Sequence, residues 1–266
     1  MSSHQIQELA FVTQKKIKLG FNLLLIGLIC FMSFMYLEVN VMDIFTSLPR
    51  LIQFFSENFL PPNLNNFRAY MGPVIDTLLF AVVGTYISAI LSFALGLLMS
   101  EQMNESPILR GGVRFFISFL RNIPILIWAS LLIFVFGIGN MVGLIALILT
   151  TVGFLSRSYA ESIDEIAGSK LEALQASGAN CFQILVHGLI PEFIPSWINW
   201  TLFSFEINIR ASAILGTVGA GGLGILIQTN LNLRNFREAT TLILILVIMV
   251  LVTEIAVSRL RRGSKL

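Results

Sequence analysis

The stretch Glu172-Ala173-Leu174-Gln175-Ala176-Ser177-Gly178, followed later by Leu189-Ile190-Pro191, lies in a moderately polar segment of an otherwise apolar chain. Apolar residues from Ile163 to Leu174 recur at helical spacing, which predicts an amphipathic helix with one buried face. On another face Ala173, Ala176 and Ser177 are small, so the backbone of a partner could come close. Gly178 is expected to end this helix in a left-handed conformation. A short second helical run, Cys181 to Val186, is expected before Pro191 opens the next apolar segment. The stretch therefore predicts a protruding helix-break-helix knob, or else an ordinary connector.

Composition indicates an integral membrane protein. Of the 266 residues 56% are hydrophobic and only 12% are charged, whereas a soluble domain carries roughly 25% charged residues. The two cysteines, Cys30 and Cys181, cannot form a disulfide framework. The two histidines, His4 and His187, are too few and too far apart for a metal site, so no bound metal is expected.

Apolar runs of about 20 residues, enough to cross a bilayer, occur six times: 20–38, 74–99, 113–137, 141–159, 193–215 and 239–258. The first run lacks a signal-peptidase site and is expected to remain as a membrane helix. In the loop after it, an apolar stripe over residues 44–59 predicts an amphipathic helix that lies in the membrane interface. The fold class is therefore all-α, with six transmembrane helices.

Lysine and arginine placement predicts the orientation. With the N-terminus inside, the inner segments hold eleven cations and the outer segments four. The inner ones are Lys15, Lys16, Lys18, Arg110, Arg114, Arg157, Lys170, Arg259, Arg261, Arg262 and Lys265, and the outer ones are Arg50, Arg68, Arg234 and Arg237. Both termini and the segment around Ala173 are thus expected in the cytoplasm.

Small residues recur every four positions in the second run, at Gly84, Ser88, Ser92 and Gly96. Small residues allow helices to approach closely in lipid. We expect them to pack inside the helix bundle, and an interface between subunits is the alternative.

A second glycine-rich feature, Gly219-Ala220-Gly221-Gly222-Leu223-Gly224, matches the spacing Gly-x-Gly-x-x-Gly. A dinucleotide site would need a strand before it in a soluble α/β unit, whereas these glycines lie between apolar runs. Gly219, Gly221, Gly222 and Gly224 are therefore expected to form a re-entrant turn or gate on the outer side. The chain has no Gly-x-x-x-x-Gly-Lys-Ser/Thr motif for binding phosphates of a nucleotide.

Ionisable residues inside spans are costly and are candidates for function. Arg121 lies about eight residues, roughly 12 Å, into the third run, with Asn122 after it. Glu206 and Arg210 lie four residues apart on one helix face, in the outer half of the fifth run. Together with Asn208 these residues are expected to line a polar path that favours anions. The alternatives are snorkelling of Arg121 to headgroups and mutual neutralisation of the pair. No catalytic triad or carboxylate pair occurs in a span, so an enzyme is not expected.

The pattern Glu-Ala-x-x-x-x-Gly at 172–178, with Ile190-Pro191 twelve residues on, resembles the coupling loop of ABC-importer permeases. The stretches 121–124, 205–210 and 213–224 resemble the phosphonate-type branch of this family, the binding-protein-dependent transport inner-membrane components. The similarity spans roughly residues 72–258. Ile125 stands where an acidic residue is expected in that branch, and Leu174 stands where a third small residue is usual.

This resemblance implies a five-helix permease core at 73–266, with the coupling loop at 160–191, preceded by an N-terminal span and outer amphipathic helix at 1–72. Glu172, Ala173, Ala176, Ser177 and Gly178 would contact a separate ABC ATPase dimer that holds ATP and magnesium, so this chain would bind no cofactor. The expected partners would be a second permease copy of the same sequence, an extracytoplasmic substrate-binding protein and the bilayer. Nucleic acid would not be a partner. The chain would reside in the cytoplasmic membrane of a prokaryote and move phosphonate, or a related phosphorus oxyanion, by alternating access.

Two alternatives remain open from the sequence. The cargo could be an amino acid such as methionine, or a quaternary amine. A stand-alone secondary transporter or membrane enzyme would predict an internal repeat, and none is evident.

Overall fold

A computed structural model describes residues 3–38, 41–65 and 67–263, and these contain helices and no strand. The helices are α1 Ser3–Tyr36, α2 Val41–Asn58, α3 Phe67–Met99, α4 Pro107–Asn122, α5 Ile125–Phe136, α6 Asn140–Ala176, α7 Cys181–Gln183, the π-helical turn η1 Ile184–Leu189, α8 Ile190–Gly216, α9 Gly222–Asn232 and α10 Phe236–Gly263. The chain forms two compact units, residues 1–57 and 58–266.

The first unit contains α1 and most of α2. Within α1 the segment Lys18–Tyr36 is apolar enough to cross a membrane, and its apolar side chains are exposed. α2 covers the predicted amphipathic stripe at 44–59, and its exposed apolar side chains include Leu48, Leu51 and Phe55. The predicted helix is therefore present, beginning a little earlier than its apolar stripe.

The second unit begins after Glu57, earlier than the boundary expected at residue 72. The reason is that the loop after α2 is tied to the last helix. Phe59 stacks on Phe236 with ring centroids 5.0 Å apart. The Asn63 amide donates to the Arg237 carbonyl (3.2 Å), and Asn63 in turn accepts a hydrogen bond from Thr241 (2.8 Å).

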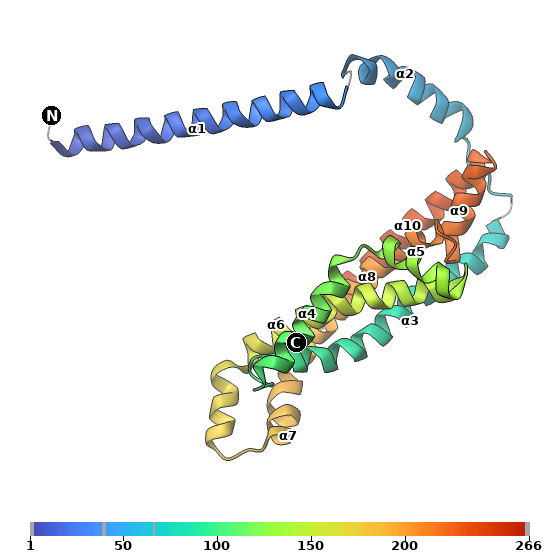
Figure 1. The fold of residues 1–266 in the computed structure, drawn as a ribbon. Coiled ribbons are helices and arrows are strands. Elements are labelled where there is room, and N and C mark those ends of the chain that lie inside the picture. The colour runs from blue at the N-terminus through green and yellow to red at the C-terminus, as the bar shows by residue number, and fades with distance from the viewer. Residues whose placement is uncertain (1–2, 39–40, 66, 264–266) are drawn as a thin grey trace. The chain divides into compact units, whose positions relative to one another are not determined.

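Long helices packed side by side form the second unit, with α3 against α6 and α8 against both (Figure 1). The small residues of α3 lie at its contact with α6, where a Cβ on Gly84 would come 2.2 Å from a methyl of Leu147. The Ser88 hydroxyl donates to the Ile148 carbonyl at 3.4 Å. Gly96 likewise lies against Tyr159 and Ala160. The predicted role of these residues in internal packing is confirmed.

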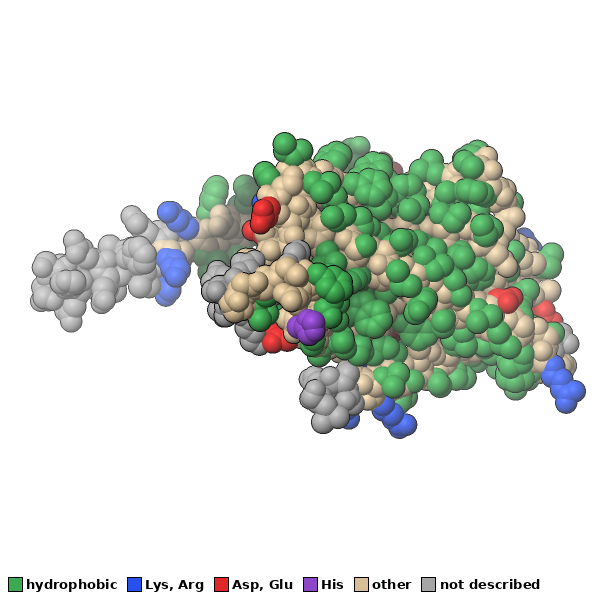
Figure 2. Space-filling view, turned by 90° about the horizontal axis from the view of Figure 1, so that it is seen from below, with side chains coloured by type: hydrophobic (Ala, Val, Ile, Leu, Met, Phe, Trp, Pro, Cys, Tyr) green, Lys and Arg blue, Asp and Glu red, His purple; other side chains and the backbone are tan. Residues whose placement is uncertain are grey.

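Apolar side chains also cover much of the outside of this bundle. Figure 2 shows them over the middle of the visible face, with Lys, Arg, Asp and Glu side chains gathered towards its two ends. This distribution is what a bilayer requires, because charged groups are costly at its centre.

The prediction of six spans is not matched. Among the described residues four helical segments are long and apolar enough to cross a membrane: Lys18–Tyr36, Phe67–Met99, Asn140–Ile166 and Phe236–Arg262. The bent pair α4–α5 would count as a fifth. The span expected at 193–215 corresponds to α8, whose Glu206, Asn208 and Arg210 lower its mean hydropathy.

The span expected at 113–137 is not one straight helix. α4 ends at Asn122, α5 begins at Ile125, and the two helices are bent by 92° at the break between them. Proline disfavours the helical conformation in the residue before it, and Ile123, before Pro124, is extended at φ −89° and ψ 119°. The depth of about 12 Å expected for Arg121 assumed a straight helix, so it does not hold.

Candidate functional site

A helical hairpin extends from one end of the bundle and contains the predicted coupling stretch (Figure 1). Its first arm is the C-terminal part of α6, which runs for 37 residues without a break from the expected fourth span to Ala176. The backbone of Gly178 has φ +87°, and the Ala179 amide donates to the Leu174 carbonyl at 3.2 Å. This six-to-one hydrogen bond with a left-handed glycine is a Schellman motif. The predicted end of the helix at Gly178 is thus confirmed.

The second arm of the hairpin returns through α7 and η1 into α8. The Ile190 amide donates to the Leu185 carbonyl, five residues back, so the chain passes into α8 through a wider turn. Such π-helical turns often mark functional positions. Pro191 lies in the first turn of α8, as expected for a residue without an amide hydrogen.

Apolar contacts hold the hairpin to the bundle. Ile184 is buried and packs with Leu174, Ala179 and Met103, the last from the loop between α3 and α4. Nearer the bundle, Ile163 is fully buried in a cluster that contains Tyr159, Leu189 and Phe193. Both arms of the hairpin are therefore packed against the bundle helices through apolar contacts.

The five predicted coupling residues all lie on this hairpin. Ser177 and Gly178 are exposed, and the Ser177 hydroxyl donates to the Leu174 carbonyl at 2.7 Å. The side chains of Glu172, Ala173 and Ala176 lie outside the described residues. The hairpin thus presents its turn on the surface.

A polar junction joins the hairpin's first arm to the loop after α3. Asp164 on α6 accepts hydrogen bonds from the Ser100 hydroxyl and from the Glu101 amide (2.8 Å). Its other carboxylate oxygen lies 3.8 Å from a terminal nitrogen of Arg114 on α4, and Arg114 also pairs with Glu101 at 3.1 Å. Three helices therefore meet at one carboxylate. This junction has no local signal in the sequence, because Asp164 and Ser100 are 64 residues apart.

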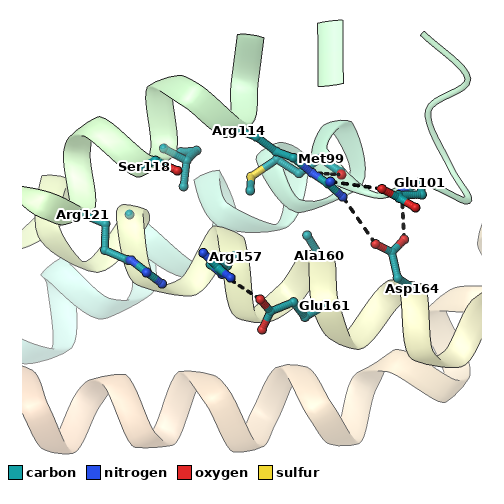
Figure 3. Close-up of a pocket in the computed structure, with 11 residues that line it drawn as sticks. Met99, Glu101, Arg114, Ser118, Arg121, Arg157, Ala160, Glu161 and Asp164 are labelled. Carbon is teal, nitrogen blue, oxygen red and sulfur yellow. Dashed lines mark hydrogen bonds and ion pairs between the residues drawn. The ribbon is translucent and has the colours of Figure 1, made fainter. Parts of the chain in front are cut away.

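Beside this junction a cavity of about 410 Å³ lies between α4 and α6 (Figure 3). The predicted path residue Arg121 lines it, together with Ser118, Arg157 and Glu161. The Nε of Arg157 pairs with Glu161 at 2.7 Å. The Arg121 side chain has no hydrogen bond or ion pair with any residue that the structure describes. Its neighbour Asn122 is exposed at the end of α4.

The other predicted path residues lie on α8, away from this cavity. Glu206 accepts from Arg210 at 2.9 Å and lies 3.7 Å from Arg261, which also lies over the Phe203 ring at 5.6 Å. Arg261 belongs to the last turn of α10, so Glu206 lies within reach of the C-terminal end of that helix. Glu206 was expected in the outer half of its span and Arg261 on the inner side, so this contact places Glu206 further towards the inner side than expected.

Asn208 is buried where three helices meet. Its amide nitrogen donates to the Thr85 hydroxyl of α3 at 2.8 Å, and its carbonyl accepts from the Thr151 hydroxyl of α6 at 3.0 Å. These two hydrogen bonds stabilise the packing of α8 against α3 and α6, independently of the predicted role of Asn208 in the path.

The predicted glycine turn joins α8 to α9. Gly219, Gly221 and Gly222 all have positive φ, between 68° and 88°. Gly224 touches α8 so closely that a Cβ would come 1.9 Å from the Ala213 carbonyl. The Leu223 amide donates to the Thr77 hydroxyl of α3 at 2.9 Å, which fixes the first turn of α9 against the bundle. The chain therefore turns sharply here, and α9 packs against the end of α8.

Comparison with known proteins agrees with this architecture. The chain is 30% identical over 206 residues to the phosphite transport system permease protein PtxC of Stutzerimonas stutzeri, covering 77% of this chain and 75% of that protein. It is 31% identical over 206 residues to the phosphate-import permease protein PhnE of Mycolicibacterium smegmatis, covering 77% of this chain but only 39% of that protein.

A solved structure of the MetNI methionine ABC transporter, in an inward-facing conformation, contains a chain with the same fold. The TM-score is 0.66 at 25% sequence identity, and the match covers 74% of this chain and 96% of that chain. The family model described as binding-protein-dependent transport system inner membrane component matches residues 92–263, more than half of the chain. The chain belongs to this family of inner membrane transport components, which are permeases rather than enzymes.

Proposed function

We propose that the chain is the transmembrane permease subunit of an ATP-driven importer for a phosphorus oxyanion such as phosphonate, phosphite or phosphate. The observation that carries the proposal is the similarity over 206 residues to permeases named for phosphite and for phosphate. The chain itself has no nucleotide-binding motif, so the energy must come from a separate ATPase.

The charges on α8 support an anionic cargo. Glu206 is shared by Arg210 and Arg261, so this group of three side chains carries one more positive than negative charge. The Arg210 side chain is 47% exposed, whereas that of Glu206 is 16% exposed. An excess of accessible cation in a low-dielectric bundle attracts anions, and a guanidinium matches the geometry of a phosphate. Arg121, Asn122 and Asn208 remain proposed parts of the same path.

In the proposed mechanism the hairpin at 160–191 carries motion from the ATPase. ATP-driven closure of an ATPase dimer would draw together the hairpins of two permease copies. Because α6 continues without a break from the hairpin into the bundle, this motion would tilt α6 and the α3 and α8 packed on it. The path between the two copies would then open outward, towards a substrate-binding protein. The glycine turn before α9 is the proposed outer gate.

The proposal includes a location and an orientation. The chain would lie in the cytoplasmic membrane of a prokaryote, with both termini and the hairpin in the cytoplasm. Two identical copies would pair. Glu172, Ala173, Ala176, Ser177 and Gly178 would form the surface that contacts the ATPase.

Reconstitution tests the proposal. The permease, its ATPase and its substrate-binding protein are placed in liposomes, and ATP-dependent uptake of labelled phosphate, phosphite and methylphosphonate is measured. Arg210→Gln should lower uptake by about tenfold, the value of one charge-assisted hydrogen bond, with assembly unchanged. Arg237→Gln, which alters an exposed arginine outside this cluster, is the matched control. Uptake by this chain alone, without ATPase or ATP, would contradict the proposal.

An amino acid such as methionine is the second candidate for the cargo, favoured by the fold shared with the methionine transporter structure. Isothermal titration of the purified substrate-binding protein separates the two candidates. Binding of a phosphorus oxyanion and not of methionine supports the first, and the reverse result replaces the cargo while leaving the permease assignment in place.

A further inference from the structure

We propose that the cavity between α4 and α6 is a binding site for a phosphate-type oxyanion, separate from the Glu206–Arg210 pair on α8. The ligand would be either a free oxyanion or the phosphodiester of an anionic lipid headgroup, because both present the same tetrahedral oxygens. This inference goes beyond the proposed function, since it holds whichever solute is transported.

The site is built from two helix faces. On α4 the residues that line the cavity, Arg114, Ser118 and Arg121, recur at helical spacing, and so do Gly153, Arg157, Glu161 and Asp164 on α6. A Cβ on Gly153 would lie 2.9 Å from the Arg121 amide nitrogen, so glycine allows the two backbones to meet at one end. At the other end the Arg114–Asp164 contact of 3.8 Å joins the helices again. Between these two contacts the cavity remains open to an oxyanion.

Unused hydrogen-bond donors converge on this space. Arg121 and the Ser118 hydroxyl have no partner among the residues described. Arg157 pairs through Nε alone, so its two terminal nitrogens are also unpaired within the described part of the chain. Figure 3 shows Arg121 and Arg157 projecting into the same cavity from the two facing helices.

The electrostatics favour an anion in the part of the cavity beside Arg121. Three arginines and three carboxylates line it, but they are not evenly matched. Glu101 and Asp164 are both held by Arg114, and Glu161 is held by Arg157, which leaves Arg121 without a counter-ion. A tetrahedral oxyanion would accept from Arg121, from the free end of Arg157 and from Ser118 at once. A guanidinium fork binds such an anion with two parallel hydrogen bonds.

Glu161 competes with this ligand. The Arg157–Glu161 pair is largely exposed, at 51% and 62% for the two side chains, and exposed pairs of this kind contribute little to stability. An incoming oxyanion could therefore take over Arg157 at small cost. Removing the Glu161 charge should strengthen anion binding, whereas removing the charge of Arg121 or Arg157 should weaken it.

The first arm of the test uses the full-length chain purified in detergent and measures the binding of ³²P-labelled inorganic phosphate by scintillation proximity. Arg121→Gln and Arg157→Gln should each lower the affinity by about tenfold or more. Glu161→Gln should raise it by about threefold, a gain that misfolding cannot produce. Arg237→Gln, outside the cavity, should leave it unchanged.

The second arm distinguishes the source of the oxyanion. Native mass spectrometry measures phosphatidylglycerol retained by the chain, with phosphatidylcholine as the neutral comparison. Loss of retained phosphatidylglycerol in Arg121→Gln, without phosphate binding by the unaltered chain, assigns the site to a lipid headgroup. If neither phosphate nor phosphatidylglycerol binding depends on Arg121 and Arg157, the inference is wrong. Normal ATP-dependent uptake alongside that result would leave the proposed function standing.

Discussion

Single residues of α8 illustrate how a polar side chain in a bundle can serve packing, transport or both. Asn208 bridges α3 and α6 through Thr85 and Thr151 with both ends of its amide. Arg210 is half-exposed and pairs only with Glu206 among the residues described. The two were predicted together as path residues, yet they lie in different surroundings, and their variants should differ accordingly.

Asn208→Ala should destabilise the chain by about 1–2 kcal/mol, because it removes two interhelical hydrogen bonds in the bundle. Asn199→Ala on the same helix should have a smaller effect, since the Asn199 side chain makes no hydrogen bond to a described residue. Unfolding of the detergent-solubilised chain by denaturant measures both. Equal losses of stability would show that the Asn208 bridges contribute nothing.

Gly224→Ala should prevent normal packing of α9, because the added methyl would meet the Ala213 carbonyl at 1.9 Å and the Gly216 Cα at 2.8 Å. Overpacking of this kind costs about 1–3 kcal/mol or more, so a lower yield of folded chain is expected. Gly112→Ala on α4 is the control, since no heavy atom lies within 4 Å of its Cβ position. That change should be neutral or slightly stabilising, given the helix propensity of alanine. Equal yields from the two variants would contradict the close approach of α8 and α9.

Some of the site residues were predictable from the sequence and others were not. Arg121 and the Glu206–Arg210 pair stood out as charges within apolar runs. The Arg157–Glu161 pair has a local signal in the sequence, its spacing of four residues on a helix. That spacing alone does not indicate that the pair lines a cavity. The Asp164–Ser100 contact and the reach of Arg261 to Glu206 carry no local signal, since both depend on how distant helices pack.

Helices show the same division between local and distant information. The end of α6 at Gly178 and the amphipathic α2 follow from residue type and spacing alone. The 92° bend at Pro124 could not be predicted in full, because a proline marks a break in a helix but not its angle. The hydropathy of α8 is low because it carries polar residues such as Glu206 and Asn208. Neighbouring helices supply partners for these residues, and composition alone cannot reveal those partners.

The unbroken helix α6 links the hairpin directly to the bundle. The hairpin arm and the bundle helix are parts of one unbroken helix, α6. Asp164 on this helix contacts the loop after α3 and Arg114 of α4. A displacement of the hairpin would thus be transmitted through α6 and the Asp164 carboxylate to α4 and to the end of α3.

Asp164→Ala should therefore lower ATP-dependent uptake several-fold while leaving the ATPase bound, because α6 would lose its polar link to α4 and to the loop after α3. Glu165→Ala is the control, since this neighbouring carboxylate is exposed and has no hydrogen bond or ion pair with a described residue. Uptake in the reconstituted importer, together with co-purification of the ATPase, measures both effects. Uptake that is unchanged in Asp164→Ala would show that the junction does not couple the helices.

For the whole molecule, family, fold and charge distribution agree on a membrane transport permease. The family match covers residues 92–263, and the bundle carries apolar side chains around its middle with charges towards its ends. The hairpin extends from one of these ends (Figure 1). We propose that this end faces the cytoplasm and binds the ATPase.

The most direct measurement is the labelling of Ser177→Cys, in a chain whose Cys30 and Cys181 are replaced by serine, with a membrane-impermeant maleimide. Ser177 is exposed beside the turn at Gly178. The account predicts labelling in inverted membrane vesicles but not in intact cells, and protection when the ATPase is bound. Labelling from outside intact cells, or no protection by the ATPase, would contradict it.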